Sequence, residues 1–253
     1  SNLRLDVVGR NLGEFDQLLT MLDLREGPKG DPDALPLKLL GNASFHGNIH
    51  GSYFALEAVG HLDSQRFEML VAKSAAEDDP NAHISPVHLL AWDAFHTDLS
   101  YTPSRLTVRN AELVRGNAAI HTAFDLLPHR TAPDSWTYDK QTHIEASVQM
   151  NDASIADLLS IVGHSYPISG ELTAHAHVSG IVDDLEGSGH IALAHGVVNG
   201  QEIPSASIQL AAQGHVMEAT HIQLAAAGGS AVGQASYDYE TSAVRGLLTG
   251  QQI

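Results

Sequence analysis

Apolar and polar residues alternate along much of this chain, and one alternating stretch occurs twice. Residues 39–51 and residues 168–180 align without a gap at an offset of 129 positions. In both stretches apolar residues or glycines hold every second position, while His46 and its counterpart His175 belong to the polar series between them. Alternation over thirteen residues is typical of a long β-strand with one apolar and one polar face. The sequence therefore predicts two equivalent strands of a repeat architecture, not one catalytic pocket.

A short amphipathic helix is predicted in each copy. The apolar spacing i, i+3, i+4, i+7 occurs within residues 15–22 and again, 140 positions later, within residues 155–162. Asp152 is a suitable N-cap for the second helix, and Gly163 is a suitable stop signal. Shorter alternating stretches predict further strands at residues 3–9, 106–108, 118–124, 144–150, 206–212, 231–239 and 244–250.

This inventory predicts a mainly β protein, with an antiparallel sheet repeated in tandem units and short amphipathic helices between the units. We expect residues 1–11 to end a preceding unit, residues 12–150 to form one repeat unit, and residues 151–253 to form a second unit that ends where a third begins. The longer connection at residues 23–36, rich in Pro, Gly and Asp, and a similar segment at residues 73–86 are interpreted as solvated insertions.

The composition of the apolar faces leaves two packing outcomes open. Aromatic residues are only 6% of the chain although hydrophobic residues are 43%, so these faces consist mostly of Ala, Gly, Leu, Ile and Val. Small residues such as Gly41, Ala43 and Gly47 either let another element approach closely or leave a hollow.

The charge of the chain excludes one class of partner. The formal net charge of −17 argues against a nucleic-acid backbone and against adsorption to anionic lipid headgroups, but it does not bear on contact with lipid tails. Protonation of the 16 histidines near pH 5 would cancel nearly all of this charge. The absence of cysteine fits both an oxidising compartment without disulfides and the cytosol.

Candidate chemistry is sparse. His175 and His177 share one side of a strand, but two imidazoles form a metal site only when a third ligand converges on them. His61 and His190 follow Gly60 and Gly189, which suggests turn positions. No nucleophile elbow, metalloprotease motif, phosphate loop or dinucleotide fingerprint is present. We therefore expect no catalytic residues, no metal site and no cofactor.

The repeated sequence segments resemble those of a known protein family. Residues 35–51, beginning Leu35-Pro36-Leu37, and residues 166–180, beginning Tyr166-Pro167-Ile168, resemble repeats of the AsmA-like superfamily, which includes the TamB-like translocation and assembly module proteins. Residues 152–159 and 113–118 also resemble segments of these repeats. The resemblance covers most of the chain, although its motifs consist of Gly, Pro and alternation without a fixed catalytic residue.

The resemblance implies a β-sheet curled into a trough with an apolar inside, in the periplasmic body of an inner-membrane-anchored protein whose anchor lies outside this sequence. It implies a non-enzymatic role in conveying lipid acyl chains or supporting outer-membrane biogenesis, with outer-membrane assembly proteins as further partners. The alternative is a rigid periplasmic spacer or protein-interaction scaffold with a packed core and no lipid. The residues expected to face the groove are Leu39, Ala43, Phe45, Ile49, Ile168, Leu172, Ala174 and Val178.

Overall fold

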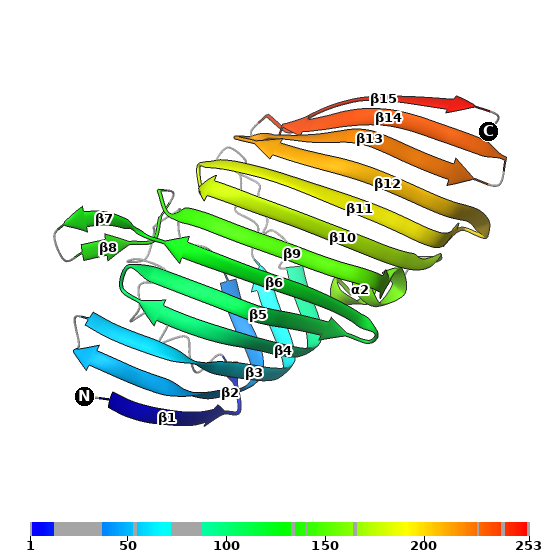
Figure 1. Cartoon of the computed structure of the whole chain (residues 1–253). Coiled ribbons are helices and arrows are strands. Elements are labelled where there is room, and N and C mark those ends of the chain that lie inside the picture. The colour runs from blue at the N-terminus through cyan, green and yellow to red at the C-terminus, as the bar shows by residue number, and fades with distance from the viewer. Residues whose placement is uncertain are drawn as a thin grey trace, which may run out of the picture.

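The protein forms one large open antiparallel sheet of thirteen strands (Figure 1). The computed structural model describes residues 2–12, 37–52, 55–71, 88–132, 135–139, 141–163, 166–226, 228–238 and 241–251. Strands follow one another in the sheet in chain order, from β1 at one edge to β15 at the other, except that β6 pairs directly with β9. The intervening strands β7 and β8 form a separate two-stranded hairpin, which projects from the sheet in Figure 1. The prediction of a mainly β, antiparallel protein is confirmed.

The strands of the N-terminal half are β1 (Asn2–Gly9), β2 (Leu37–Ser52), β3 (Ala55–Val71), β4 (His88–Thr102), β5 (Arg105–Arg115), β6 (Ala118–Leu127), β7 (His129–Ala132) and β8 (Ser135–Thr137). Those of the C-terminal half are β9 (His143–Ser154), β10 (Ile168–Ile181), β11 (Asp184–Val198), β12 (Gln201–Gln213), β13 (Val216–Ala226), β14 (Gly229–Asp238) and β15 (Ala243–Gln251). The alternating stretches therefore form strands as predicted.

One helix, α2 (Ile155–Ile161), lies in the described part of the chain, where the second amphipathic stretch predicted it. Its N-cap is Ser154, whose hydroxyl accepts a hydrogen bond from the Asp157 amide, so the prediction of Asp152 as N-cap is wrong. Asp152 instead belongs to β9. Gly163 follows the helix with φ of +69°, a conformation that suits glycine at a helix end, which confirms the predicted stop. The other predicted helix, within residues 15–22, lies outside the described residues.

The hairpins β2–β3 and β10–β11 share their irregularities as well as their sequence. Gly41 and Gly170 both have positive φ, and the register shifts beside each of them. Arg66 and His195, which lie opposite these glycines, have φ values of +54° and +52°. Both pairs of residues are separated by 129 positions, so the offset found in the sequence also relates the backbone conformations.

The likeness of the two halves continues past these hairpins with a different offset. Strands β5 and β6 cover residues 105–115 and 118–127, and β13 and β14 cover residues 216–226 and 229–238, which is a constant displacement of 111 positions. The offset falls because the first copy has the longer connection between its third and fourth strands, from Val71 to His88. The unit boundaries expected from the sequence stay a prediction.

A series of β-bulges crosses the sheet on every second strand. In each bulge two residues of one strand face a single residue of a neighbour, and the residue with positive φ is Arg66 in β3, Asn110 in β5, Asp152 in β9, His195 in β11 and His221 in β13. A bulge bends its strand and increases the local twist. The repeated bulges therefore account for curvature that simple alternation does not predict.

Two buried clusters lie on the apolar face, where α2 packs. Helix α2 contacts β4, β5, β9 and β10. The first cluster contains Leu12, Ala43, Phe67, Trp92 and Ile161, with the rings of Phe67 and Phe95 stacked at 5.0 Å. The second contains Ala118, Met150 and Ala153. Of the helices in the described residues, none has the length and apolar character needed to cross a membrane.

Candidate functional site: an apolar sheet face

A continuous row of apolar side chains crosses the sheet perpendicular to its strands. Each member faces the next in the register of neighbouring strands, so the row is set by strand pairing and not by sequence proximity. The transverse apolar row consists of Ala43, Ser64, Phe95, Leu113, Ile120, Met150, Ala174, Ile191 and Ile208, and continues beyond the bulge of β13 through Ile222, Gly233 and Leu248. Ser64 is its one polar member.

Burial decreases along this row from the N-terminal to the C-terminal half. Ala43, Ser64 and Met150 are buried, with exposed fractions of 3%, 1% and 6%. Ile191 and Ile208 are only half-buried, and Leu248 is 64% exposed at the far edge. Helix α2 contacts β4, β5, β9 and β10, in the middle of the sheet, and strands β11 to β15 lie beyond it (Figure 1). The apolar side of the sheet thus has a packed part and an open part.

The open part is wide as well as long. On β11 to β15 the positions that share the side of Ile191 are almost all apolar, and of the described residues named next only Ala231 is buried. We call these positions the C-terminal apolar face: Leu185, Ile191, Leu193, Ala206, Ile208, Leu210, Ala212, Met217, Ala219, Ile222, Leu224, Ala231, Ala235, Tyr237, Val244 and Leu248.

The structure separates the groove residues predicted from the sequence into these two parts. Ala43 belongs to the buried cluster with Trp92, and Leu172 and Ala174 pack beside Met150. The remaining described candidates are half-buried: Phe45, Ile49, Ile168 and Val178. Leu39 lies in β2, but its side chain is outside the described residues. The predicted residues mark the N-terminal and central part of the face, and sequence reasoning missed most of the C-terminal apolar face.

Equivalent positions in the two hairpins differ in how much of the apolar face they fill. In the first hairpin the ring of Phe45 lies over the facing glycines Gly47 and Gly60, where an added methyl group would lie within 2.6 Å of the ring. In the second hairpin Ala174 takes the place of Phe45, and Ala176 faces Gly189. The smaller side chains leave the second hairpin less filled.

The dimensions of the open part suit a hydrocarbon chain. Strands β11 to β15 are five adjacent strands, and four interstrand spacings of about 4.8 Å give roughly 19 Å. The hydrocarbon core of a bilayer is about 30 Å for two leaflets, so one acyl chain extends roughly 15 Å. A single acyl chain therefore fits along the open part of the transverse apolar row.

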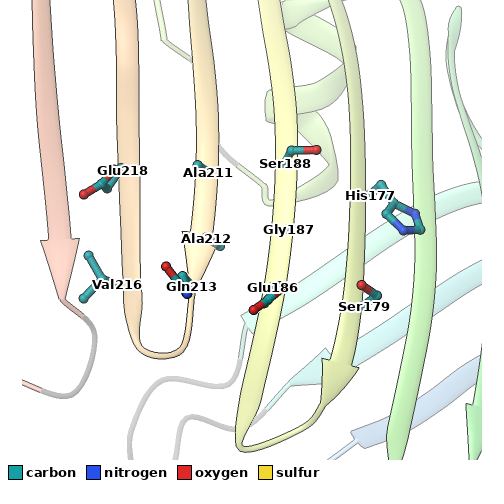
Figure 2. A pocket seen from close by; sticks show the side chains of 10 residues that line it. All are labelled: His177, Ser179, Glu186, Gly187, Ser188, Ala211, Ala212, Gln213, Val216 and Glu218. Atoms are coloured by element: carbon teal, nitrogen blue, oxygen red, sulfur yellow. The ribbon is translucent and has the colours of Figure 1, made fainter.

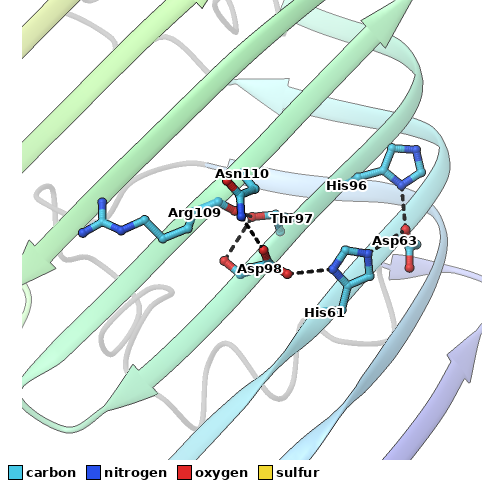
Figure 3. Close-up of polar contacts among 7 residues, drawn as sticks. All are labelled: His61, Asp63, His96, Thr97, Asp98, Arg109 and Asn110. Atoms are coloured by element: carbon cyan, nitrogen blue, oxygen red, sulfur yellow. Dashed lines mark hydrogen bonds and ion pairs between the residues drawn. The ribbon is translucent and has the colours of Figure 1, made fainter.

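The opposite face of the sheet carries a polar network in the N-terminal half (Figure 3). His61 lies between two carboxylates, with its Nδ1 2.9 Å from Asp98 and its Nε2 3.4 Å from Asp63. Asp63 also accepts from His96 at 2.6 Å, and the Asn110 amide donates to Asp98 at 2.7 Å. The hydrogen bond to Asp98 raises the pKa of His61 above its usual value, and those from Asn110 and His61 lower the pKa of Asp98.

Asp125 is the most deeply buried member of the polar face, with an exposed fraction of 3%. It accepts hydrogen bonds from Arg105 at 3.0 Å, from Thr107 at 2.5 Å and from Arg109 at 2.6 Å. The pKa of Asp125 is lowered to about 2, chiefly by the hydrogen bond from Arg105, although burial of the carboxylate acts in the opposite direction and raises this pKa. All three hydrogen-bond donors belong to β5, whereas Asp125 belongs to β6. These hydrogen bonds therefore link β6 to β5.

Three open hollows also lie on the polar face. One of them, of about 700 Å³, is bordered by β10 to β13 and lined by residues such as His177, Glu186 and Glu218 (Figure 2). Its lining contains both polar and apolar residues, and the labelled polar side chains do not point toward one common position. The hollows therefore do not coincide with the predicted apolar groove.

The histidine positions predicted from the sequence are placed by strand pairing. His175 faces His190 across β10 and β11, with ring centroids 5.3 Å apart, and His46 faces His61 in the equivalent hairpin. The expectation that His61 and His190 occupy turns is wrong, because both lie within strands. Within the described part of the chain, no three His, Cys, Asp or Glu side chains are grouped so that they could hold a metal ion.

No protein-family model, curated protein or solved structure matches this chain.

Proposed function

We propose that this chain is a non-enzymatic segment of a bacterial cell-envelope protein whose C-terminal apolar face shelters or conveys lipid acyl chains. The observation that carries the proposal is the exposure of this face, on which Met217 and Tyr237 are 44% and 43% exposed. Soluble proteins rarely leave a large contiguous apolar surface in water, and such surfaces mark binding sites for apolar partners.

The energetics of acyl binding suit such a site. Each buried methylene contributes about 0.8 kcal/mol, so ten methylenes contribute roughly 8 kcal/mol before the cost of ordering the chain. Binding of this kind requires apolar area and shape but no directed polar contact. The absence of a specific motif on the apolar strands is therefore what the proposal expects.

The resemblance to the AsmA-like superfamily supports the wider setting. A TamB-like segment would lie in the periplasm, would belong to a protein anchored in the inner membrane, and would support outer-membrane biogenesis together with outer-membrane assembly proteins. In this proposal the bulges curl the sheet into the trough that the family resemblance implies. The apolar inside of the trough would be continuous along the transverse apolar row.

A rigid spacer or protein-interaction scaffold is the second candidate. The observation in its favour is the packed N-terminal half, where Ile161 of α2 and Trp92 are buried in one cluster. If the whole apolar side were covered in this way in the functional protein, no acyl chain could enter. The two candidates therefore differ in the occupancy of the C-terminal apolar face.

Lipid binding can be tested with a matched pair of variants on β12. Ile208 belongs to the transverse apolar row, whereas the adjacent Gln209 points to the polar face and is exposed. We expect the purified protein to yield lipid in an organic extract analysed by mass spectrometry, and to take up a fluorescent fatty acid. Ile208→Glu should reduce this uptake at least tenfold, whereas Gln209→Glu should leave it unchanged.

Far-UV circular dichroism of both variants checks that the sheet is retained. Folded wild-type protein that yields no lipid and takes up no fatty acid would favour the scaffold. Equal loss of uptake in both variants would assign the binding to charge or to general destabilisation and would reject the apolar face as the site.

A further inference from the structure

The two hairpins related by the offset of 129 positions carry the same cross-strand pair of histidines. His46 faces His61 across β2 and β3, and His175 faces His190 across β10 and β11. Facing residues share one side of a sheet, so both pairs lie on the polar face. The rings of His175 and His190 are close together, with centroids 5.3 Å apart. The surroundings of the two pairs can therefore be compared strand by strand.

Carboxylates accompany the first pair on both flanking strands. On β1, Asp6 faces His46 and lies 2.9 Å from its Nδ1. On β4, Asp98 faces His61 and lies 2.9 Å from its Nδ1 (Figure 3). The hydrogen bond with His46 lowers the pKa of Asp6, and the hydrogen bond with Asp98 raises the pKa of His61. A proton taken up by either ring of this pair therefore completes an ion pair.

Glutamine holds both flanking positions beside the second pair. Gln149 of β9 faces His175, and Gln209 of β12 faces His190. An amide is neutral, so it does not balance the charge of a protonated imidazole. Neither imidazole has a carboxylate partner in the part of the chain that the structure describes. Proton uptake here places two positive charges directly opposite each other, which destabilises a strand pair.

Other ionisable groups near the second pair do not compensate these charges. The ionisable side chains within five positions of the pair or of its facing residues are Glu145 and Asp152 on β9, Glu171 and His177 on β10, and Glu186 and His195 on β11, and β12 has none there. Asp152 accepts a hydrogen bond from Thr173, and Glu171 lies 3.3 Å from His195. The two remaining glutamates lie four positions along their strands, and His177 itself becomes positive in acid.

We propose that protonation of the facing residues His175 and His190 destabilises the β10–β11 hairpin at acidic pH, whereas the equivalent β2–β3 hairpin is stabilised by its carboxylates. The sensitive hairpin lies between the two parts of the apolar side, because β10 contacts α2 and β11 begins the C-terminal apolar face. Since His175 is exposed and water screens its charge, the response is a local opening and changes the global free energy of unfolding little. The inference does not depend on lipid binding.

Native-state hydrogen exchange of the full chain at pH 7 and pH 5 measures this opening. Protection factors are compared, because they correct for the pH dependence of intrinsic exchange. For the wild type we expect the protection of β10 and β11 to fall roughly threefold between pH 7 and pH 5. The protection of β2 and β3 should be retained or should increase.

Three variants separate the facing pair from a general effect of acid. His175→Gln removes one of the two opposing charges and should abolish the fall. Gln209→Asp supplies beside His190 the carboxylate that Asp98 provides in the first hairpin, and it should abolish or reverse the fall. His177→Gln is the matched control on the same side of β10, where His177 faces Ser188, and it should retain the fall.

Far-UV circular dichroism at both pH values checks that each variant keeps its sheet. A wild type whose β10–β11 protection does not fall, or a fall shared equally by β2–β3, would overturn the proposal. An unchanged fall in His175→Gln or in Gln209→Asp would also overturn it.

Discussion

At the scale of single residues, the two hairpins that share their backbone geometry differ in the side chains that complete the apolar face. Phe45 covers Gly47 and Gly60 in the first hairpin, whereas its counterpart in the second hairpin is the smaller Ala174. Glycine is required where the ring approaches the backbone, because any side chain there would collide with it.

The matched glycines Gly60 and Gly189 test this difference. A methyl group at Gly60 would lie 2.5 Å from the Phe45 ring and 2.6 Å from the His46 carbonyl oxygen, whereas at Gly189 the nearest atom is 3.2 Å away. We expect Gly60→Ala to lower the free energy of unfolding by about 2 kcal/mol, because overpacking forces the neighbours to move. Gly189→Ala should change it by less than about 1 kcal/mol. Urea unfolding measures both, and equal effects would contradict the assigned packing.

The polar face predicts a maximum of stability at mildly acidic pH. The pKa of Asp125 is lowered from 3.8 to about 2, so its contribution of roughly 2 kcal/mol is present above pH 4 and is lost as the pH falls through 2. The pKa of His61 is raised from 6.5, so its contribution is complete below that pH and is lost as the pH rises through the folded-state pKa.

Urea unfolding followed as a function of pH measures both limits. Asp125→Asn should remove most of the loss of stability below pH 4, and His61→Gln should remove part of the loss above pH 6.5. A wild type whose free energy of unfolding rises steadily from pH 6 to pH 8 would contradict the His61 assignment.

At the scale of elements, the strands could be predicted from the sequence but the bulges could not. Alternation of period two gives the strands directly, and the apolar spacing of residues 155–162 gives α2. The bulges depend on positive φ at residues such as Arg66 and His195, which have no sequence signature because glycine is the usual residue in that conformation. The N-cap could have been found, since Ser154 precedes Asp157 by three positions in the manner of a capping box.

The apolar face was predicted only in part because the bulges, which set the register between strands, have no sequence signature. The candidate residues belong to the two most regular strands, β2 and β10, and Ala43 and Ala174 lie in or beside the buried clusters. The transverse apolar row additionally requires the register of every strand pair, which each bulge shifts by one residue. The pairing of His61 with Asp98 depends on the same register, so the polar network was also missed.

The bulge in β11 can be tested at His195. This residue has φ of +52°, which is strained for a β-branched side chain. We expect His195→Val to lower the free energy of unfolding by about 1–2 kcal/mol, and His195→Gly to have little effect. His190→Val, on the same strand without positive φ, is the control and should be tolerated. Thermal unfolding compares the three variants, and equal destabilisation by His195→Val and His195→Gly would show that the side chain, not the backbone conformation, matters.

At the scale of the whole molecule, the sheet combines a packed N-terminal half with an open C-terminal half. The polar face is stabilised by ion pairs and hydrogen bonds, as at Asp125, and α2 contacts the sheet at β4, β5, β9 and β10. On the C-terminal strands the molecule presents a broad apolar surface on a regular scaffold. The central claim is that the C-terminal apolar face binds hydrocarbon.

Photolabelling with a diazirine-bearing fatty acid, followed by peptide mass spectrometry, tests that claim most directly. The account predicts labels on alternate residues of β11 to β14, at Ile191, Ile208, Leu210 and Ile222, because only one side of each strand belongs to the apolar face. It predicts no labelling of the polar-face neighbours His190 and Gln209. Labels confined to the polar face, or spread equally over both sides of the strands, would contradict it.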